Sequence, residues 1–183
     1  MLEIRLHGRG GQGAVTSAEL VAIAAINKGN FAQAFPSFGP ERRGAPVVAF
    51  CRVDDKKINI RAKVYHPDVV IVLDPGLLTL LDPTEGMSDD GILILNTKKA
   101  PEDIDALSGK SVRVATVDAN TIAMEELGRP IVNTTMLGAF IKATGLIDIE
   151  DIQEPLMERF GSKLGSRNMK ALQRAYEEVS LKE

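Results

Sequence analysis

The chain has 183 residues, of which 44% are hydrophobic, and a net charge of −3 at pH 7, so we expect one globular domain over residues 1–183. A nucleic-acid-binding protein would usually carry a basic excess, and the longest apolar run, residues 20–26, is too short to span a bilayer. We therefore expect contact with neither nucleic acid nor membrane, and, because the start of the chain shows no secretory-signal pattern, a cytoplasmic location.

The chain opens with a short apolar strand over residues 2–7, a Gly-Arg-Gly-Gly-Gln-Gly turn at 8–13 and a helix over 14–28. The spacing fits the G-x-G-x-x-G pattern of a strand–turn–helix that receives phosphates. Glycine reaches positive φ at little cost and lets a ligand or another chain approach the backbone, while the N–H groups that open the helix favour an anion. The candidate binding residues here are Gly8, Gly10, Gly11, Gln12 and Gly13.

Two ordinary nucleotide sites are disfavoured. A dinucleotide site normally has an Asp or Glu about 20 residues after the glycines to hold the ribose hydroxyls. Here no acid follows the predicted helix before Glu41, and the Gly-Lys-Ser/Thr ending of the triphosphate P-loop is missing. A free-standing nicotinamide-dependent reductase therefore stays an alternative, but a weakened one.

A strand at 31–35 leads into a long irregular segment, 36–46, which contains three prolines and presents Glu41, Arg42 and Arg43 together. Arginine forks suit phosphate and carboxylate groups, so a loop beside the start of the first helix would add them to an anion site. The alternative is a solvated loop with a charge pair. Because long loops of this kind are often functional, Arg42 and Arg43 join the candidate binding residues.

The remaining elements predict the fold class. Strands at 47–53 and 58–60 flank four charged residues and indicate an antiparallel hairpin, and 69–73 is a β-branched run typical of a central parallel strand. Further strands are expected at 92–95 and 112–117, followed by helices after Asp118 and at 134–143, 152–160 and 167–179. Together they predict a Rossmann-like α/β fold with an open, twisted, mostly parallel sheet, flanking helices and a helical C-terminal part.

Few side chains suggest chemistry. Cys51 is the only cysteine, so the chain has no internal disulfide and by itself cannot supply the four thiolates of an iron–sulfur cluster. We expect it to be a buried strand thiol. His7 and His66 have no second ligand nearby, so no metal site is predicted, and Asp74 before Pro75 is expected to be a turn residue. No residue is predicted to be catalytic.

Three motifs together resemble the gamma subunit of the 2-oxoacid:ferredoxin oxidoreductases. They are the glycine turn, the Ser-Phe-Gly-Pro-Glu-Arg-Arg-Gly-Ala-Pro stretch at 37–46, and Asn-Thr-Thr-Met-Leu-Gly-Ala at 133–139. Tyr-His-Pro-Asp at 65–68 and Asp-Pro at 74–75 strengthen the match. Within the family, the Pro-Glu-Arg-Arg-Gly-Ala-Pro form looks most like the pyruvate-type enzyme, since homologues acting on 2-oxoglutarate tend to differ in this loop.

The resemblance implies a non-catalytic subunit of a complex that oxidatively decarboxylates pyruvate to acetyl-CoA and CO2 while reducing ferredoxin. It implies alpha, beta and delta partner subunits, which would carry thiamine diphosphate, magnesium and the iron–sulfur clusters. This chain would hold no cofactor alone but would help enclose coenzyme A and pack on the thiamine-binding subunits. Alternatives are the gamma subunit of a 2-oxoglutarate or branched-chain 2-oxoacid enzyme, and a purely structural scaffold in the complex.

Coenzyme A carries several negative charges, so the N–H groups of the first helix with Arg42 or Arg43 are expected partners for its phosphates. A ribose-binding acid would repel its 3′-phosphate, which agrees with the missing acid. The competing account is that the same glycines and arginines form the interface with partner subunits.

Overall fold

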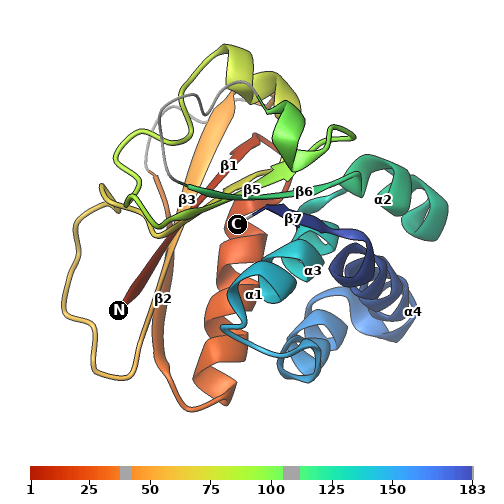
Figure 1. Cartoon of the computed structure of the whole chain (residues 1–183). Helices are drawn as coiled ribbons and strands as arrows, with labels where there is room; N and C mark the ends of the chain where they lie inside the picture. The colour runs from red at the N-terminus through yellow and green to blue at the C-terminus, as the bar shows by residue number, and fades with distance from the viewer. Residues whose placement is uncertain (38–42, 105–111, 183) are drawn as a thin grey trace.

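The computed structural model describes residues 1–37, 43–104 and 112–182, and within them one sheet has the strand order β2-β3-β1-β4-β5-β6-β7. β1 is antiparallel to β3 and parallel to β4, and the parallel pairing continues through β5 and β6. The mostly parallel sheet confirms the predicted α/β class (Figure 1). The strands are β1 (Leu2–Arg9), β2 (Phe31–Pro36), β3 (Pro46–Asp54), β4 (Val69–Val72), β5 (Ile92–Asn96), β6 (Arg113–Val117) and β7 (Ser180–Lys182).

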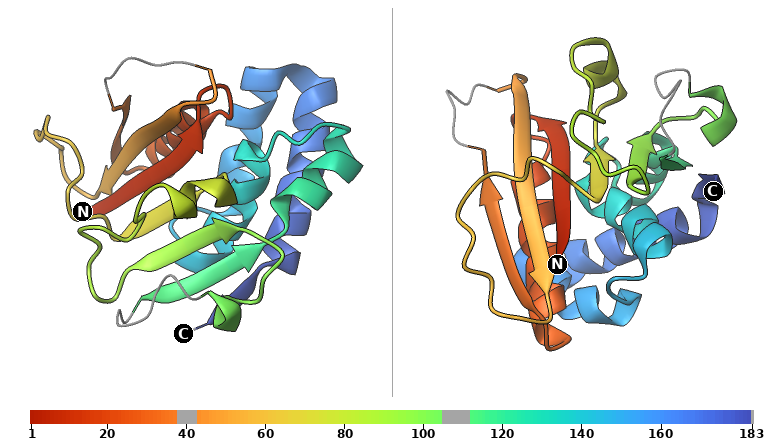
Figure 2. Two further views of the ribbon diagram at one scale, coloured as in Figure 1. Left: turned by 90° about the horizontal axis from the view of Figure 1, so that it is seen from above. Right: turned by 60° about the vertical axis from the view of Figure 1, so that its left-hand side comes forward.

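The two faces of the sheet are covered differently (Figures 1 and 2). On one face lie α1 (Ala14–Asn27), α3 (Asn133–Thr144) and α4 (Ile149–Glu178), whose apolar side chains share the main core with the sheet, and α2 (Ala119–Leu127) packs on α4. On the other face, a small apolar cluster joins β4 and β5 to η1 (Pro75–Thr79) and the turns around it, and η2 (Pro101–Asp103) follows β5. No helix in the described part of the chain is long and apolar enough to cross a membrane.

The central strand β1 has a different character on each face. Successive side chains of a strand point to opposite faces, and Ile4 and Leu6 belong to the helix-covered core. Glu3, Arg5 and His7 therefore point to the other face, where Glu3 faces Arg52 of β3 in register. Polar and charged side chains thus lie under the irregular cover of the sheet, while the helix side is apolar.

The predicted strand at 58–60 is wrong. β3 lies between β1 and β2, so both of its hydrogen-bonding edges are used and no edge remains for a hairpin partner. The segment after β3 is instead held by side chains of the sheet: Gln33 Nε2 donates to the carbonyl oxygen of Ile58 at 3.0 Å, and Arg52 Nη2 donates to that of Lys63 at 3.1 Å.

The C-terminal helices differ from the prediction in how they are joined. The expected helices at 152–160 and 167–179 form one element, α4, which begins earlier with a capping box between Asp148 and Asp151. Gly161 breaks its helical geometry with φ 73° and ψ 165°, so the two halves meet at a kink with no linker between them. The short edge strand β7 was not predicted.

Arg52 is expected to matter for stability because its side chain is only 1% exposed. Nε lies 2.7 Å from Glu3 Oε1, and the guanidinium sits 5.4 Å from the ring centre of Phe35. We expect Arg52→Leu to lower the free energy of unfolding by about 2–4 kcal/mol, since it leaves a half-buried carboxylate unpaired. Urea unfolding measures this, with the exposed Arg61→Leu as the control, expected within about 0.5 kcal/mol of wild type. Similar losses in the two variants would contradict the prediction.

Candidate functional site

The predicted glycine turn joins β1 to α1, and its glycines are required for different reasons. Gly11 and Gly13 have φ of 93° and 81°, a conformation that favours glycine. A Cβ on Gly13, the N-cap of α1, would also lie 2.6 Å from Asn133 Nδ2. Gly8 has an ordinary backbone, but a Cβ there would lie 3.2 Å from Leu73 Cδ1. Gly8 therefore serves close packing, whereas Gly11 and Gly13 shape the turn.

Gln12 is engaged inside the turn. Its Oε1 accepts from the backbone N–H of Arg9 at 2.7 Å, and its Nε2 donates to Asp74 Oδ2 at 2.9 Å. Arg9 Nε donates to the same oxygen at 2.9 Å, and Asp74 Oδ1 accepts from the N–H of Gly76 at 2.8 Å. Asp74 is thus the expected turn residue, and it also ties the glycine turn to the end of β4. Desolvation opposes ionisation of Asp74, but these hydrogen bonds outweigh it and hold its pKa below the usual range.

Asp74→Asn is expected to lower the free energy of unfolding near pH 7 by about 1–2 kcal/mol, because an amide cannot accept from both Gln12 and Arg9 while bonding Gly76. A carboxyl with a lowered folded pKa stabilises the fold above its unfolded pKa and loses this contribution as the pH falls through the folded value. The gap between wild type and variant should therefore begin to narrow as the pH falls below about 4. Urea unfolding near pH 7 and near pH 3 measures it; a gap that is the same at both pH values would argue against the role given to the carboxylate.

The arginine loop meets the glycine turn through the backbone. Gly10 and Arg43 form an isolated parallel bridge, the N–H of Gly10 donates to Ala45 O at 2.9 Å, and the N–H of Gly44 donates to Gly10 O at 3.2 Å. The expected neighbourhood of loop and turn is therefore present. The side chain of Arg43 is exposed, and Arg42 lies outside the described residues.

A cleft of about 440 Å³ opens beside the turn, between it, the α2–α3 connection and α4. Figure 2 shows α4 next to the turn that follows β1. Among the described residues, no Asp or Glu lines this cleft, and Arg43 does not line it either. Sequence reasoning missed its three cationic side chains: Arg129, Arg159 and Arg167.

The cleft has the chemistry of an anion site with an apolar border. The first turn of α1 has neither a side-chain cap nor an acidic residue, so its N–H groups and the helix dipole favour negative charge. Leu127, Phe160 and Leu164 add apolar surface, and the volume falls within the range of small-molecule sites. We call this the α1–α4 cleft.

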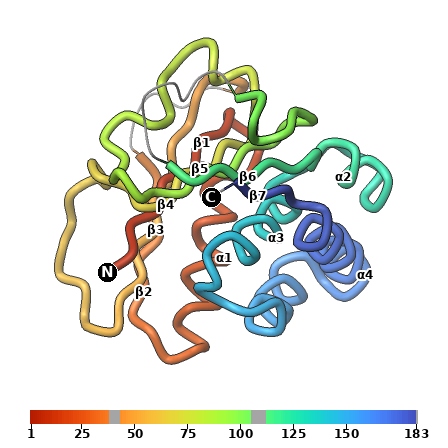
Figure 3. The backbone as a smooth tube through the Cα atoms, viewed as in Figure 1, coloured from red at the N-terminus to blue at the C-terminus, as the bar shows by residue number. Residues whose placement is uncertain are grey.

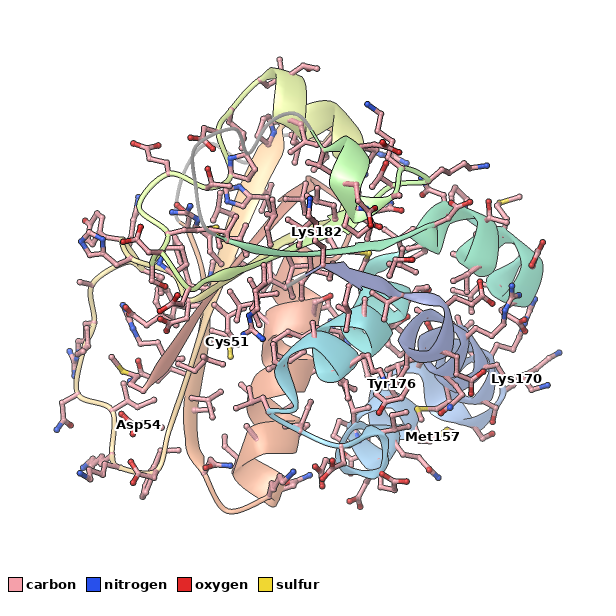
Figure 4. All side chains as sticks on the ribbon, in the orientation of Figure 1. Cys51, Asp54, Met157, Lys170, Tyr176 and Lys182 are labelled. Carbon is pink, nitrogen blue, oxygen red and sulfur yellow. The ribbon has the colours of Figure 1, made fainter. Side chains whose placement is uncertain are left out.

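Two other side chains of interest lie away from the cleft. His7 is buried on the irregularly covered face, and neither ring nitrogen has a hydrogen-bond partner within the described ranges. Burial, with a smaller contribution from Arg5, lowers the pKa of His7 to about 4. Cys51 is a buried thiol of β3, as expected, and lies on the α1 side of the sheet (Figure 4); burial raises its pKa to about 12.

The sequence and fold are similar to those of proteins with known roles. The model of the family "Pyruvate ferredoxin/flavodoxin oxidoreductase" matches residues 3–178. A common gamma subunit of the pyruvate and ketoisovalerate oxidoreductases of Pyrococcus furiosus is 53% identical, covering 99% of this chain and 98% of the relative. Pyruvate synthase subunit PorC of Methanothermobacter thermautotrophicus is 52% identical, with 98% and 96% covered. The crystal structure of pyruvate oxidoreductase subunit PORC from Thermotoga maritima aligns with a TM-score of 0.86 and 41% identity, covering 100% of this chain and 98% of that one.

Proposed function

Since the chain belongs to the pyruvate ferredoxin/flavodoxin oxidoreductase family, we propose that it is the gamma subunit of a pyruvate:ferredoxin oxidoreductase. The complex converts pyruvate and coenzyme A to acetyl-CoA and CO2 and reduces ferredoxin. The observation that carries this proposal is similarity over nearly the full length to subunits of that name. Residues 1–183 act as one domain, which packs on alpha, beta and delta partners in the cytoplasm.

Within this complex, the chain helps to enclose coenzyme A. In the glycine turn, Gly8 to Gly13, the N–H of Gly10 already donates to Ala45 O, so the N–H groups of Gly11 and Gly13 would be the ones to bind its phosphates. Arg43 is bridged to Gly10, and Arg42 precedes Arg43 in the sequence. Thiamine diphosphate, magnesium and the iron–sulfur clusters belong to the partner subunits. If the glycines and arginines instead form a subunit interface, replacing Arg42 and Arg43 by alanine should impair assembly. If they hold coenzyme A, the same change should raise its KM while the complex assembles normally.

The strand arrangement supports the family function over a free-standing nicotinamide-dependent reductase. In a dinucleotide site, the strand after the first helix lies next to the first strand and presents the ribose-binding acid. Here β2 lies at the edge of the sheet, with β3 between it and β1. The end of β2 is therefore displaced from the glycine turn by one strand, and no acid precedes Glu41 there.

A second candidate function is service in a branched-chain 2-oxoacid oxidoreductase. The specific observation is that the Pyrococcus furiosus relative is a subunit common to a pyruvate and a ketoisovalerate enzyme. A chain shared in this way would be found in two complexes that differ in their other subunits.

The native complex containing this chain tests both candidates. After purification, it should reduce a low-potential acceptor when pyruvate and coenzyme A are both supplied, and should lose this activity when either is left out. Activity with ketoisovalerate in a second, separable complex would establish the shared role. A chain that purifies alone and binds NAD tightly would overturn the proposal.

A further inference from the structure

We propose that the α1–α4 cleft binds the diphosphate group of a small organic molecule, with Arg159, Arg129 and Asn133 as its main polar contacts. For coenzyme A the inference rests on the proposed function and deepens it, because Gly11, Gln12 and Gly13 of the glycine turn line the cleft. The polar side chains that it adds are not those of Arg42 and Arg43. Its ligand is defined by chemistry: two linked phosphates on a partly apolar body. Coenzyme A of the complex and a separate nucleoside diphosphate both satisfy this description.

The first argument is the unbalanced charge of the cleft. Three arginines come from two separate segments, the α2–α3 connection and α4, and none meets an acidic side chain among the described lining residues. Arg159 has one contact to Thr16 Oγ1 at 3.4 Å, and Arg167 uses Nε to donate to Glu126 O at 2.7 Å. Each guanidinium has five N–H donors, so most remain available to a ligand. Bidentate pairing with phosphate is the interaction that this geometry favours.

The second argument is a buried amide without a partner. Asn133 lines the cleft and is only 4% exposed, yet its side chain makes no hydrogen bond to any described residue. It lies against Gly13, where a Cβ would come 2.6 Å from Nδ2, so the amide sits at the uncapped start of α1. Its amide atoms are absent from the sealed, unpartnered polar atoms of the described residues, so the amide opens onto the cleft, where a ligand can reach it. A ligand oxygen held between the amide and the N–H groups of α1 would supply the partner.

The other asparagine of the cleft, Asn168, differs from Asn133 because its side-chain amide has hydrogen-bond partners. Asn168 also lines the cleft and is also 4% exposed. Its Oδ1 accepts from the hydroxyl of Thr134, and its Nδ2 donates to Leu164 O at 2.9 Å. The first of these bonds joins α3 to α4, and the second lies within α4. Asn168 is therefore structural, whereas Asn133 is free to bind.

Charge and size favour a diphosphate over a single phosphate or carboxylate. The three guanidinium groups and the start of α1 present more positive character than one phosphate neutralises. The cleft of about 440 Å³ leaves room beyond the phosphates. Leu127 and Phe160 border that space and would contact the organic part of the ligand.

Equilibrium binding to the purified complex tests the site, with pyrophosphate, ADP and coenzyme A as probes. We expect pyrophosphate and ADP to bind the wild type, and Arg159→Gln to weaken both at least about tenfold, equivalent to about 1.4 kcal/mol. Asn133→Asp keeps the shape of the side chain but adds a negative charge, and should abolish binding without lowering Tm. Arg61→Gln is the matched control, because Arg61 is exposed and lies outside the cleft, and should leave pyrophosphate affinity within about twofold.

The outcomes separate the two ligand sources. If coenzyme A displaces pyrophosphate from the wild type but not from Arg159→Gln, the site binds the diphosphate of coenzyme A. ADP binding that leaves the KM for coenzyme A unchanged assigns it to a separate nucleotide. Failure of all three probes to bind wild type, or equal binding to Arg159→Gln, overturns the inference. Either result is independent of pyruvate-dependent activity, which tests the proposed function.

Discussion

Gly138→Ala is expected to destabilise the protein by more than about 4 kcal/mol, or to prevent folding altogether. Gly138 lies in the middle of α3, where that helix packs on α4, and a Cβ there would overlap the backbone carbonyl oxygen of Leu172. The same Cβ would lie 2.9 Å from the backbone nitrogen of Tyr176, so two turns of α4 would have to move (Figure 4 labels Tyr176). Backbone atoms of a packed helix cannot give way as a flexible side chain can.

The sign of this effect is informative, because alanine is the better helix former. In an exposed helix interior the same change would stabilise by up to about 1 kcal/mol. Gly145→Ala is the matched control: Gly145 ends α3 with φ 61° and has open space around it, so only backbone strain of about 1–2 kcal/mol is expected. Yield, Tm and urea unfolding measure both variants. If Gly138→Ala were as stable as the wild type, the backbones of α3 and α4 could not lie as close together at Gly138 as the structure has them.

The free energy of unfolding of the wild type is expected to fall by about 3 kcal/mol on acidification because of His7, and His7→Leu should abolish this fall. Burial, followed by the charge of Arg5, lowers the pKa of His7 from 6.5 to about 4. Between these values the unfolded chain holds a proton that the folded chain does not, so wild-type stability falls as the pH drops through this window and levels off below it. Leucine carries no proton, so the variant should lack this component.

The free energy of unfolding of wild type and His7→Leu should therefore be compared from about pH 8 to about pH 4. At the upper end we expect the variant to be at least as stable, because leucine replaces two buried ring nitrogens that lack partners. The exposed His66→Leu serves as the control and should show the pH dependence of wild type. If the free energies of unfolding of wild type and His7→Leu depended on pH in the same way, His7 could not have the lowered pKa of a buried, neutral imidazole.

The parts of the fold that follow from local pattern were predictable. The uninterrupted β-branched run of β4 needs apolar cover on both faces, and the glycine turn after β1 fixes the start of α1. The strand expected at 58–60 failed because pairing is a property of the whole sheet. Nothing local shows that both edges of β3 are already taken by β1 and β2.

The sequence predicted the glycine turn and the neighbouring Arg43, but it did not predict the three arginines of the α1–α4 cleft. The glycine turn and Arg43 are close in space, as their motifs indicated. Nothing in the sequence distinguishes Arg129, Arg159 and Arg167 from ordinary solvated residues, since an exposed arginine carries no signal of what it faces. Their convergence depends on the kink at Gly161 and on the packing of α4 beside the turn, neither of which sequence spacing encodes.

The central position of β1, between β3 and β4, has a consequence for how the chain folds (Figure 3). Its partners are distant in sequence: Leu2 pairs with Val53, and Ile4 with Val69. The β2–β3 pair closes a much shorter loop, so we expect it to form with α1 before β1 is enclosed between β3 and β4. Because so much of this sheet is completed by long-range pairing, we expect the protein to fold more slowly than a helical bundle of similar size.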